Sequence, residues 1–354
     1  MPGASDPTGG ENASTAEPAV ERIGHAGASP EGTNSTYVLS DRGLVVDPGP
    51  PGEGAWETLT DGLAAADLAL DAVETVVVTH WHADHAGSAP RLAAAADADL
   101  VLHDADAPLV GRYAAERRRR MDRDARRLRE WGVPDDVVAE ITARDEPSPM
   151  PDEFPVRAVT EGARVAGGEV LHTPGHTKGH LALAVGDALF VGDAVLPTYT
   201  PNVGGSDTRL DAALSVYLDT LDRLAERAAP AAGGAGEPAP TPYPGHGTAV
   251  DLPTRIAEIR RHHADRVGDV VRALPGPGDA SDGGRTPWAV ARDLFGELSG
   301  IHAKMGAGEA AAHLAFAADA GFVERVGADP DRYVGADREP TESALEAAVA
   351  PSRP

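Results

Sequence analysis

The stretch Thr79-His80-Trp81-His82-Ala83-Asp84-His85 decides how the rest of this 354-residue sequence is interpreted. It closes the apolar, β-branched run 74–79, which is typical of a buried strand. Three imidazoles and a carboxylate within six residues at the end of a strand cannot all be satisfied as core residues. A loop that wraps around a cation uses all of them, since imidazole suits zinc or iron and the carboxylate adds negative charge. The stretch therefore predicts a metal site.

Three shorter motifs place further ligand-type side chains after predicted strands or on Gly/Pro turns. They are Thr173-Pro174-Gly175-His176-Thr177, Val191-Gly192-Asp193 and Pro244-Gly245-His246-Gly247. An α/β sandwich brings the ends of strands from two sheets together at one edge. We therefore expect His176, Asp193 and His246 to join the first motif there.

Strands and helices alternate along the first part of the chain. The pattern predicts a hairpin over 35–47, a helix over 56–69, a strand over 74–79, a helix over 88–97 and a strand over 99–103. Further strands are predicted over 156–159, 169–172, 181–185 and 188–191, followed by a helix over 209–229. This order predicts an α/β sandwich.

The domain organisation follows from the same pattern. We expect a catalytic domain over 20–252, with a helical insertion at 108–145 and a flexible Ala/Pro/Gly loop at 228–242. Helices over 253–274, 286–298 and 309–320, then a strand over 322–326, indicate a small winged-helix-like module at 253–327. Thr286 is a predicted N-cap and Gly321 a predicted helix end. Residues 1–19 and 328–354 lack periodicity and are predicted to be disordered tails.

The His-x-His-x-Asp-His run, with the later Thr-Pro-Gly-His, Gly-Asp and Pro-Gly-His-Gly elements in order, resembles the hydrolase branch of the metallo-β-lactamase superfamily. The resemblance covers about residues 34–250 and implies an αββα sandwich with a dinuclear metal site. It implies that one metal is bound by His80, His82 and His176, and the second by Asp84, His85 and His246. Asp193 then bridges the two metals, and Asp47 steadies the His-rich loop from behind.

A subgroup is also indicated. The block 192–197 with the following Thr200-Pro201-Asn202 resembles a glyoxalase-II-like subgroup that carries a helical insertion and a C-terminal winged-helix-like region. A β-lactamase-like endoribonuclease has a similar C-terminal module. His180 is expected to support the metal loop through a hydrogen bond, although a plain packing role fits equally well.

The implied chemistry is metal-dependent hydrolysis. Two Zn²⁺ ions (or iron or manganese) roughly 3.5–4 Å apart hold a bridging water as hydroxide near neutral pH. Asp84 is the catalytic residue that orients this nucleophile and passes a proton to the leaving group. The leading interpretation is glyoxalase-II-like hydrolysis of a small ester or thioester. Cleavage of single-stranded RNA or another phosphodiester is the alternative, and an iron-dependent persulfide dioxygenase is a third.

Residues 116–130 hold eight arginines and four acidic residues, a local charge of +4 on a chain of net charge −25. One interpretation is a lid over the metal-bearing edge, in which Arg117, Arg118, Arg119 and Arg120 bind an anionic substrate, with Tyr199 as a further substrate contact. The other is a solvated helix paired with the acidic surface, or a homodimer contact.

Composition limits the partners. A net charge of −25 argues against nonspecific binding to nucleic acid or an anionic membrane. The predicted helix over 309–320 contains no Lys or Arg, so duplex DNA is not expected. There is no cysteine, which excludes disulfides and thiolate ligands. Apolar stretches are too short for a membrane span and the N-terminus lacks signal-peptide features, so we expect a soluble cytoplasmic protein.

Overall fold

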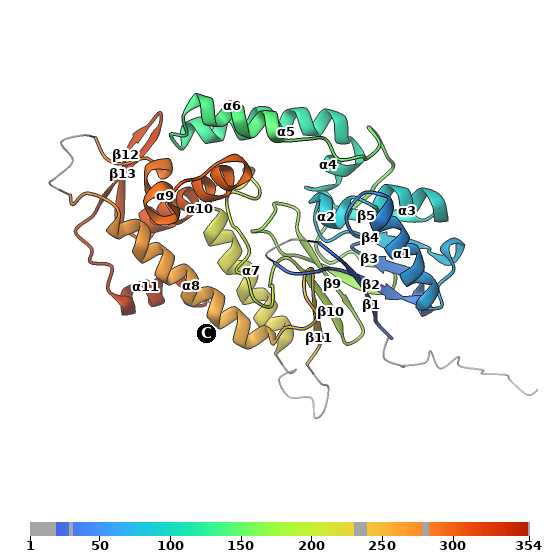
Figure 1. The fold of residues 1–354 in the computed structure, drawn as a ribbon. Coiled ribbons are helices and arrows are strands. Elements are labelled where there is room, and N and C mark those ends of the chain that lie inside the picture. The colour runs from blue at the N-terminus through green and yellow to red at the C-terminus, as the bar shows by residue number, and fades with distance from the viewer. Residues whose placement is uncertain (1–18, 28–30, 230–238, 278–282, 353–354) are drawn as a thin grey trace, which may run out of the picture.

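The computed structural model describes residues 19–27, 31–229, 239–277 and 283–352, and its centre is a pair of stacked β-sheets (Figure 1). The first sheet has the order β1-β2-β3-β4-β5-β6. Its strands are β1 (Glu21–His25), β2 (Asn34–Leu39), β3 (Leu44–Val46), β4 (Thr75–Val77), β5 (Asp99–His103) and β6 (Arg157–Val159). The second has the order β11-β10-β9-β8-β7. Its strands are β7 (Arg164–Val165), β8 (Gly168–His172), β9 (Leu181–Val185), β10 (Ala188–Gly192) and β11 (Thr241–Pro244).

Strand direction brings the sequence motifs to one edge. Strands β3, β4, β5 and β6 pair in parallel, so their carboxyl ends lie together. In the second sheet β8 and β10 are both antiparallel to β9, and β10 is parallel to β11. Strands β8, β10 and β11 therefore also end on one side, and each is followed by a motif with ligand-type residues.

Apolar side chains form three layers of core around the sheets. Between the sheets lie Tyr37, Val77 and Val101 of the first and Leu183 and Phe190 of the second. Helices α1 (Glu53–Ala65) and α3 (Ala89–Ala96) pack on the outer face of the first sheet. Helices α7 (Ala213–Ala228) and α8 (Leu252–Arg272) cover the second sheet. The predicted αββα sandwich is thus confirmed.

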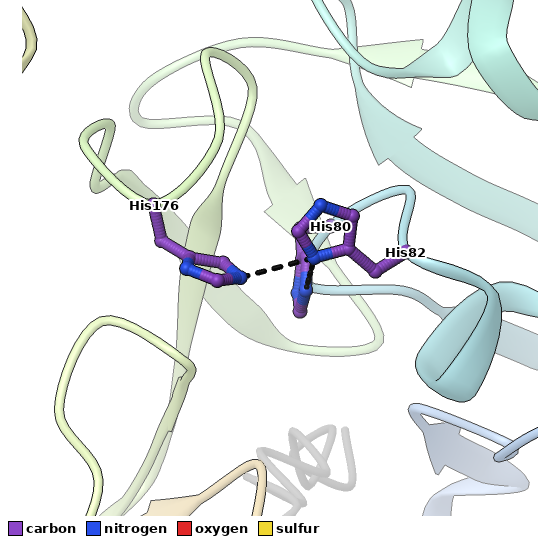
Figure 2. A group of neighbouring side chains, drawn as sticks. All are labelled: His80, His82 and His176. Carbon is purple, nitrogen blue, oxygen red and sulfur yellow. Dashed lines mark hydrogen bonds between the residues drawn. The ribbon is translucent and has the colours of Figure 1, made fainter. Parts of the chain in front are cut away.

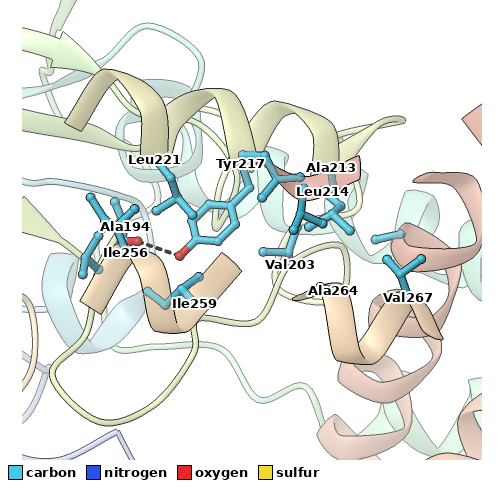
Figure 3. Packing of buried hydrophobic residues seen from close by; sticks show 14 of the residues in the cluster. Ala194, Val203, Ala213, Leu214, Tyr217, Leu221, Ile256, Ile259, Ala264 and Val267 are labelled. Carbon is cyan, nitrogen blue, oxygen red and sulfur yellow. Dashed lines mark hydrogen bonds between the residues drawn. The ribbon is translucent and has the colours of Figure 1, made fainter. Parts of the chain in front are cut away.

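Tyr217 of α7 shows how tightly the outer layer of the second sheet is packed (Figure 3). Its ring is fully buried among Leu221 and the α8 residues Ile256 and Ile259. Its hydroxyl donates to the carbonyl of Ala194 at 2.7 Å, so its polar end is satisfied. This contact ties α7 to the loop that directly follows β10.

The predicted helical insertion comprises α4 (Ala107–Gly111), α5 (Tyr113–Glu130) and α6 (Asp135–Arg144). In Figure 1, α5 and α6 run along the top of the molecule, from α4 toward the C-terminal helices. Leu128 and Ile141 pack there against Ala303 and Ala307. The insertion therefore packs one apolar face against the C-terminal region.

The C-terminal region contains α9 (Pro287–Phe295), α10 (Gly300–Asp319), the hairpin β12 (Val323–Ala328) and β13 (Asp331–Gly335), and α11 (Glu342–Val349). The Thr286 hydroxyl caps α9 by accepting from the Ala289 amide at 3.2 Å, as predicted. Gly321, at φ 76°, directly follows the last turn of α10. Helix α10 begins nine residues before the predicted start at Glu309.

The prediction of a disordered tail over 328–354 is wrong for the described residues. Strand β13 completes a hairpin, and α11 buries Leu345 and Val349 against α8. These two residues are four apart and therefore share one face of the helix. Residues 1–18 of the predicted tail over 1–19, and residues 230–238 of the predicted loop over 228–242, lie outside the described residues. No helix in the described ranges is both long and apolar enough to cross a membrane.

Candidate metal centre

All seven predicted metal ligands meet at the shared edge of the two sheets. His80 and His82 follow β4, and the short helix α2 (Ala83–Ala86) carries Asp84 and His85. His176 follows β8, Asp193 follows β10 and His246 follows β11. Their ligand atoms form three sets within 4.8 Å: His80–His82–His176, His80–His85–Asp193 and Asp84–His85–His246. The first is called here the three-histidine group and the last the mixed group.

Each member of the three-histidine group directs one ring nitrogen at the others (Figure 2). The Nδ1 of His82 lies 3.0 Å from His80 Nε2 and 3.0 Å from His176 Nε2. The opposite nitrogens bond outward: His176 Nδ1 donates to the Asn202 carbonyl at 3.2 Å, and His82 Nε2 to the Ser206 carbonyl at 3.4 Å. Because a carbonyl can only accept, these two rings carry their protons on the outward side. Their inward nitrogens are left as lone pairs.

In the mixed group, too, the outward nitrogens have hydrogen-bond partners. His246 Nδ1 donates to the Gly32 carbonyl at 3.3 Å, and His85 Nδ1 donates to Asp47 at 3.1 Å. The two Nε2 atoms face each other at 3.3 Å. The Asp84 carboxylate lies 3.5 Å from each of them.

Asp193 lies between the two groups. Its carboxylate is 3.8 Å from His176 Nε2, 3.5 Å from His85 Nε2 and 3.4 Å from His246 Nε2. The Oδ1 atom is buried without a hydrogen-bond partner among the described residues. Gly245 leaves room for this carboxylate, because a Cβ at that position would lie 2.1 Å from Asp193 Oδ1. A carboxylate in this position can contact two cations at once.

The protonation states fit bound cations. Burial lowers the pKa of His80 well below its usual value and that of His82 to about 3, so both rings are neutral, as metal ligands must be. Burial opposes protonation of His246, but hydrogen bonds with Asp193 and Asp84 raise its pKa to about 10. The carboxylates therefore favour positive charge beside His246 Nε2. Inward lone pairs, a partnerless buried carboxylate oxygen and this demand for positive charge together fit metal ions.

Asp47 and His180 form hydrogen bonds with candidate ligand residues: Asp47 with the His85 ring and His180 with the Asp193 backbone. The Asp47 carboxylate accepts from the amide and hydroxyl of Thr79, each at 2.7 Å, and from His85. Asp47 holds a left-handed conformation at φ 51°, a strained geometry typical of functional positions. His180 Nε2 accepts from the Asp193 amide at 3.1 Å, and its other nitrogen bonds Thr173 at 2.7 Å. His180 therefore holds the backbone at Asp193 in place rather than only filling space.

Several polar contacts of the site are not predicted from the sequence. Asn34 donates to the backbone carbonyl of Asp84 at 3.1 Å and to its carboxylate at 3.2 Å. Asp106, Asp207 and Arg209 form a buried cluster beside the loops that carry the three-histidine group. No local motif marks these residues, because they reach the site only through the tertiary fold.

The predicted substrate contacts are more scattered. Helix α5 does lie beside the metal loops, because the Arg120 guanidinium stacks over Trp81 at 5.3 Å and Arg123 contacts Thr208. However, Arg117 and Arg120 both bind Asp145. Of the remaining candidates, Arg118 is exposed, Arg119 binds Glu116 and Tyr199 is 47% exposed. The four arginines do not form one surface facing the metal centre.

Comparisons with known proteins agree with this geometry. The family model of the metallo-beta-lactamase superfamily matches residues 28–232, more than half of the chain. The chain is 28% identical over 249 residues to the lactamase-like protein adaB of Aspergillus niger, covering 69% of this chain and 59% of that protein. It is 25% identical over 276 residues to the atrochrysone carboxyl ACP thioesterase of Passalora fulva, covering 75% and 64%. The chain thus spans about 60% of the length of these curated relatives.

The structural comparison extends over nearly the whole fold. A metallo-beta-lactamase family protein from Thermus thermophilus superposes with a TM-score of 0.68 at 27% identity, covering 89% of this chain and 98% of that one. That coverage includes the C-terminal region beyond the family match. The ligand motifs, the αββα sandwich and the family match all agree, and the chain belongs to the metallo-beta-lactamase superfamily.

Proposed function

We propose that the protein is a dinuclear metal-dependent hydrolase that acts on a small ester or thioester. The observation that carries the proposal is the position of Asp193 between two complete ligand sets. His80, His82 and His176 would hold one ion, and Asp84, His85 and His246 the other. The nitrogen-rich ligand set favours zinc, with iron or manganese as alternatives. When bound, such a metal pair supplies Lewis-acid polarisation and an activated water.

Asp84 is the residue placed for proton transfer. Burial opposes its ionisation, but His85 and His246 hold its pKa below the usual range, so the carboxylate is ionised near neutral pH. Its side chain is 44% exposed, unlike the buried carboxylate of Asp193. Asn34 fixes its orientation. Asp84 can therefore accept a proton from the attacking water and deliver it to the leaving thiolate or alkoxide.

A cavity beside the metal loop supports a small, uncharged acyl group. Its volume is about 190 Å³, and its lining includes Trp81 and Ala83, the chain neighbours of His82. Leu109, Tyr113 and Met150 supply further apolar surface. A cavity this small takes part of a substrate, since pockets for drug-sized ligands begin near 300 Å³.

The arginines around this cavity do not favour an anionic substrate. Arg117 and Arg120 line it, but so do Asp145, which binds both arginines, and Glu146, so the two positive charges face two negative ones. This balance favours a neutral acyl group over an RNA phosphate. The relative from Passalora fulva that is named a thioesterase is consistent with acyl transfer to water.

Metal analysis and parallel assays test the proposal. Purified, metal-loaded protein should contain about two ions per chain and hydrolyse an acetyl thioester faster than bis(p-nitrophenyl) phosphate or single-stranded RNA. His246→Ala should remove about one ion, whereas His302→Ala, at an exposed histidine of α10, should keep both. One ion or fewer in loaded wild-type protein contradicts the dinuclear site. Preferential RNA cleavage contradicts the substrate class.

A further inference from the structure

We propose that Arg209 is a positioning residue for the three-histidine half of the metal centre alone. It acts through two buried carboxylates, Asp106 and Asp207, and the mixed half is held by a different set of contacts. The inference rests on the metal binding proposed above.

Asp106 contacts both loops that carry the three-histidine group. Its side chain is fully buried. One carboxylate oxygen accepts from the Trp81 amide at 3.3 Å and from the Thr177 hydroxyl at 2.8 Å. The other accepts from the Gly179 amide at 2.9 Å. Trp81 lies between His80 and His82, and Thr177 follows His176, so one carboxylate fixes the spacing of the two loops.

Asp207 supports the same group through a second set of contacts. It accepts from the Lys178 amide at 2.8 Å, two residues after His176. The preceding residue, Ser206, donates its hydroxyl to the His176 carbonyl at 2.6 Å and accepts from His82 Nε2 at 3.4 Å. The turn that contains Asp207 therefore contacts two of the three histidines directly.

Arg209 makes this pair of carboxylates compatible with burial. Its Nε lies 2.9 Å from both oxygens of Asp207, and its Nη2 bonds Asp106 and Asp207. Its side chain is 13% exposed, so water screens the cluster only weakly. Without the guanidinium, two buried anions would face each other, and the loops bound to them would separate.

The mixed group has separate support. Asn34 binds Asp84, and the outward nitrogens of His85 and His246 bond Asp47 and the Gly32 carbonyl. Within the described part of the chain, no hydrogen bond or ion pair of Arg209, Asp106 or Asp207 reaches Asp84, His85 or His246. Loss of Arg209 should therefore weaken one metal position and spare the other.

The test isolates each position. In a His246→Ala background the remaining high-affinity ion occupies the three-histidine group, and in a His176→Ala background it occupies the mixed group. Zinc is titrated against a chromophoric chelator, with and without Arg209→Met. Dissociation constants should rise about 10–100-fold in the first background, the usual effect of losing an outer partner, and less than about 3-fold in the second.

Two further variants serve as controls. Arg209→Lys keeps the positive charge but lacks the several N–H donors of the guanidinium, so it should weaken zinc binding less than Arg209→Met does. Arg223→Met removes another arginine, which binds Glu161 at the surface and the His172 carbonyl, and should leave both constants unchanged. Equal weakening in both backgrounds, or no weakening in either, overturns the proposal.

A measurement without metal separates this proposal from the proposed function. In metal-free protein, Arg209→Met should speed hydrogen exchange of the Trp81, Lys178 and Gly179 amides at least about 10-fold. The Thr79 amide, which is bound by Asp47, should exchange at the wild-type rate. If wild-type protein binds no metal pair, the proposed function fails and this exchange pattern still decides the role of Arg209. A uniform change in exchange overturns it.

Discussion

Replacing Lys304 by methionine should lower the free energy of unfolding by about 3 kcal/mol, because it leaves a buried carboxylate without its cation. Lys304 is 5% exposed on α10, and its ammonium donates to Asp124 of α5 at 2.8 Å. The pair joins the helical insertion to the C-terminal region. Asp124 also accepts from Thr208, in the turn that follows Asp207.

The magnitude follows from what remains around Asp124. Removing one member of a buried ion pair costs about 3–5 kcal/mol when the other charge has no substitute. Here Asp124 keeps the Thr208 hydroxyl and a longer contact with Arg120 at 3.4 Å, which places the loss at the lower end of that range. In Asp124→Asn/Lys304→Met both charges are gone. That double variant should lose about 2–3 kcal/mol less than the sum of the single losses.

Urea unfolding of the four proteins in this cycle measures both quantities. The sequence contains only one other lysine, Lys178, whose side chain is exposed. Lys178→Met is therefore the matched control and should change stability by no more than about 0.5 kcal/mol. If Lys304→Met is no more destabilising than Lys178→Met, the ion pair does not hold α5 to α10 and the reasoning fails.

Three further predictions concern the site, the pH dependence and the C-terminus. Asp84→Ala should lower kcat at least about 100-fold; a near wild-type kcat with full metal content, measured together, contradicts its role. Burial lowers the pKa of His313 to about 3 in the folded protein. Between about pH 6.5 and pH 3 this histidine is therefore protonated in the unfolded chain but not in the folded protein, so the free energy of unfolding decreases as the pH falls through this range. In urea unfolding at a series of pH values, His313→Gln should reduce the dependence of the free energy of unfolding on pH by about 1.4 kcal/mol per pH unit. His302→Gln, a replacement at an exposed position, should not reduce it. Leu345→Ala should cost about 2–4 kcal/mol in the same assay, and the exposed Glu346→Ala almost nothing; equal effects would mean that α11 does not pack on α8.

The ligands could be predicted from the sequence because each stands within a short motif at a strand end. His80, His82 and His85 lie close along the chain, and the direction of β4 settles which edge they occupy. His176 and His246 lie on Gly/Pro turns, which can be recognised from the local sequence alone. Local patterns thus predict the residues that the structure brings together as candidate ligands.

The supporting residues have no such pattern. Asp106, Asp207 and Arg209 are charged residues outside the recognised motifs, and sequence alone favours an exposed position for them. They are buried because three separate loops converge on them, a property of the tertiary fold. Asn34 likewise is a strand residue, and its hydrogen bond to Asp84 depends on the position of α2 in the fold. The proposed role in positioning the three-histidine group therefore falls on Arg209, a residue that no motif marks.

The charge of the Arg-rich helix also depends on partners that the local sequence does not show. Counting charge over residues 116–130 gives +4, which favours an anion-binding lid. Some of the acids that pair with its arginines lie outside the helix: Asp145 binds Arg117 and Arg120, and Asp211 binds Arg127. A count over one helix leaves out such partners, although Asp145 and Glu146 line the cavity beside Trp81 together with Arg117 and Arg120. Two arginines and two acidic residues line that cavity, so its charge is close to balanced, and under the proposed function the size and polarity of the acyl group decide which substrate binds. If the cavity is balanced in charge, the KM for a neutral thioester should be nearly equal at low and high salt. A KM that rises steeply with salt would instead support a lid whose arginines bind an anionic substrate.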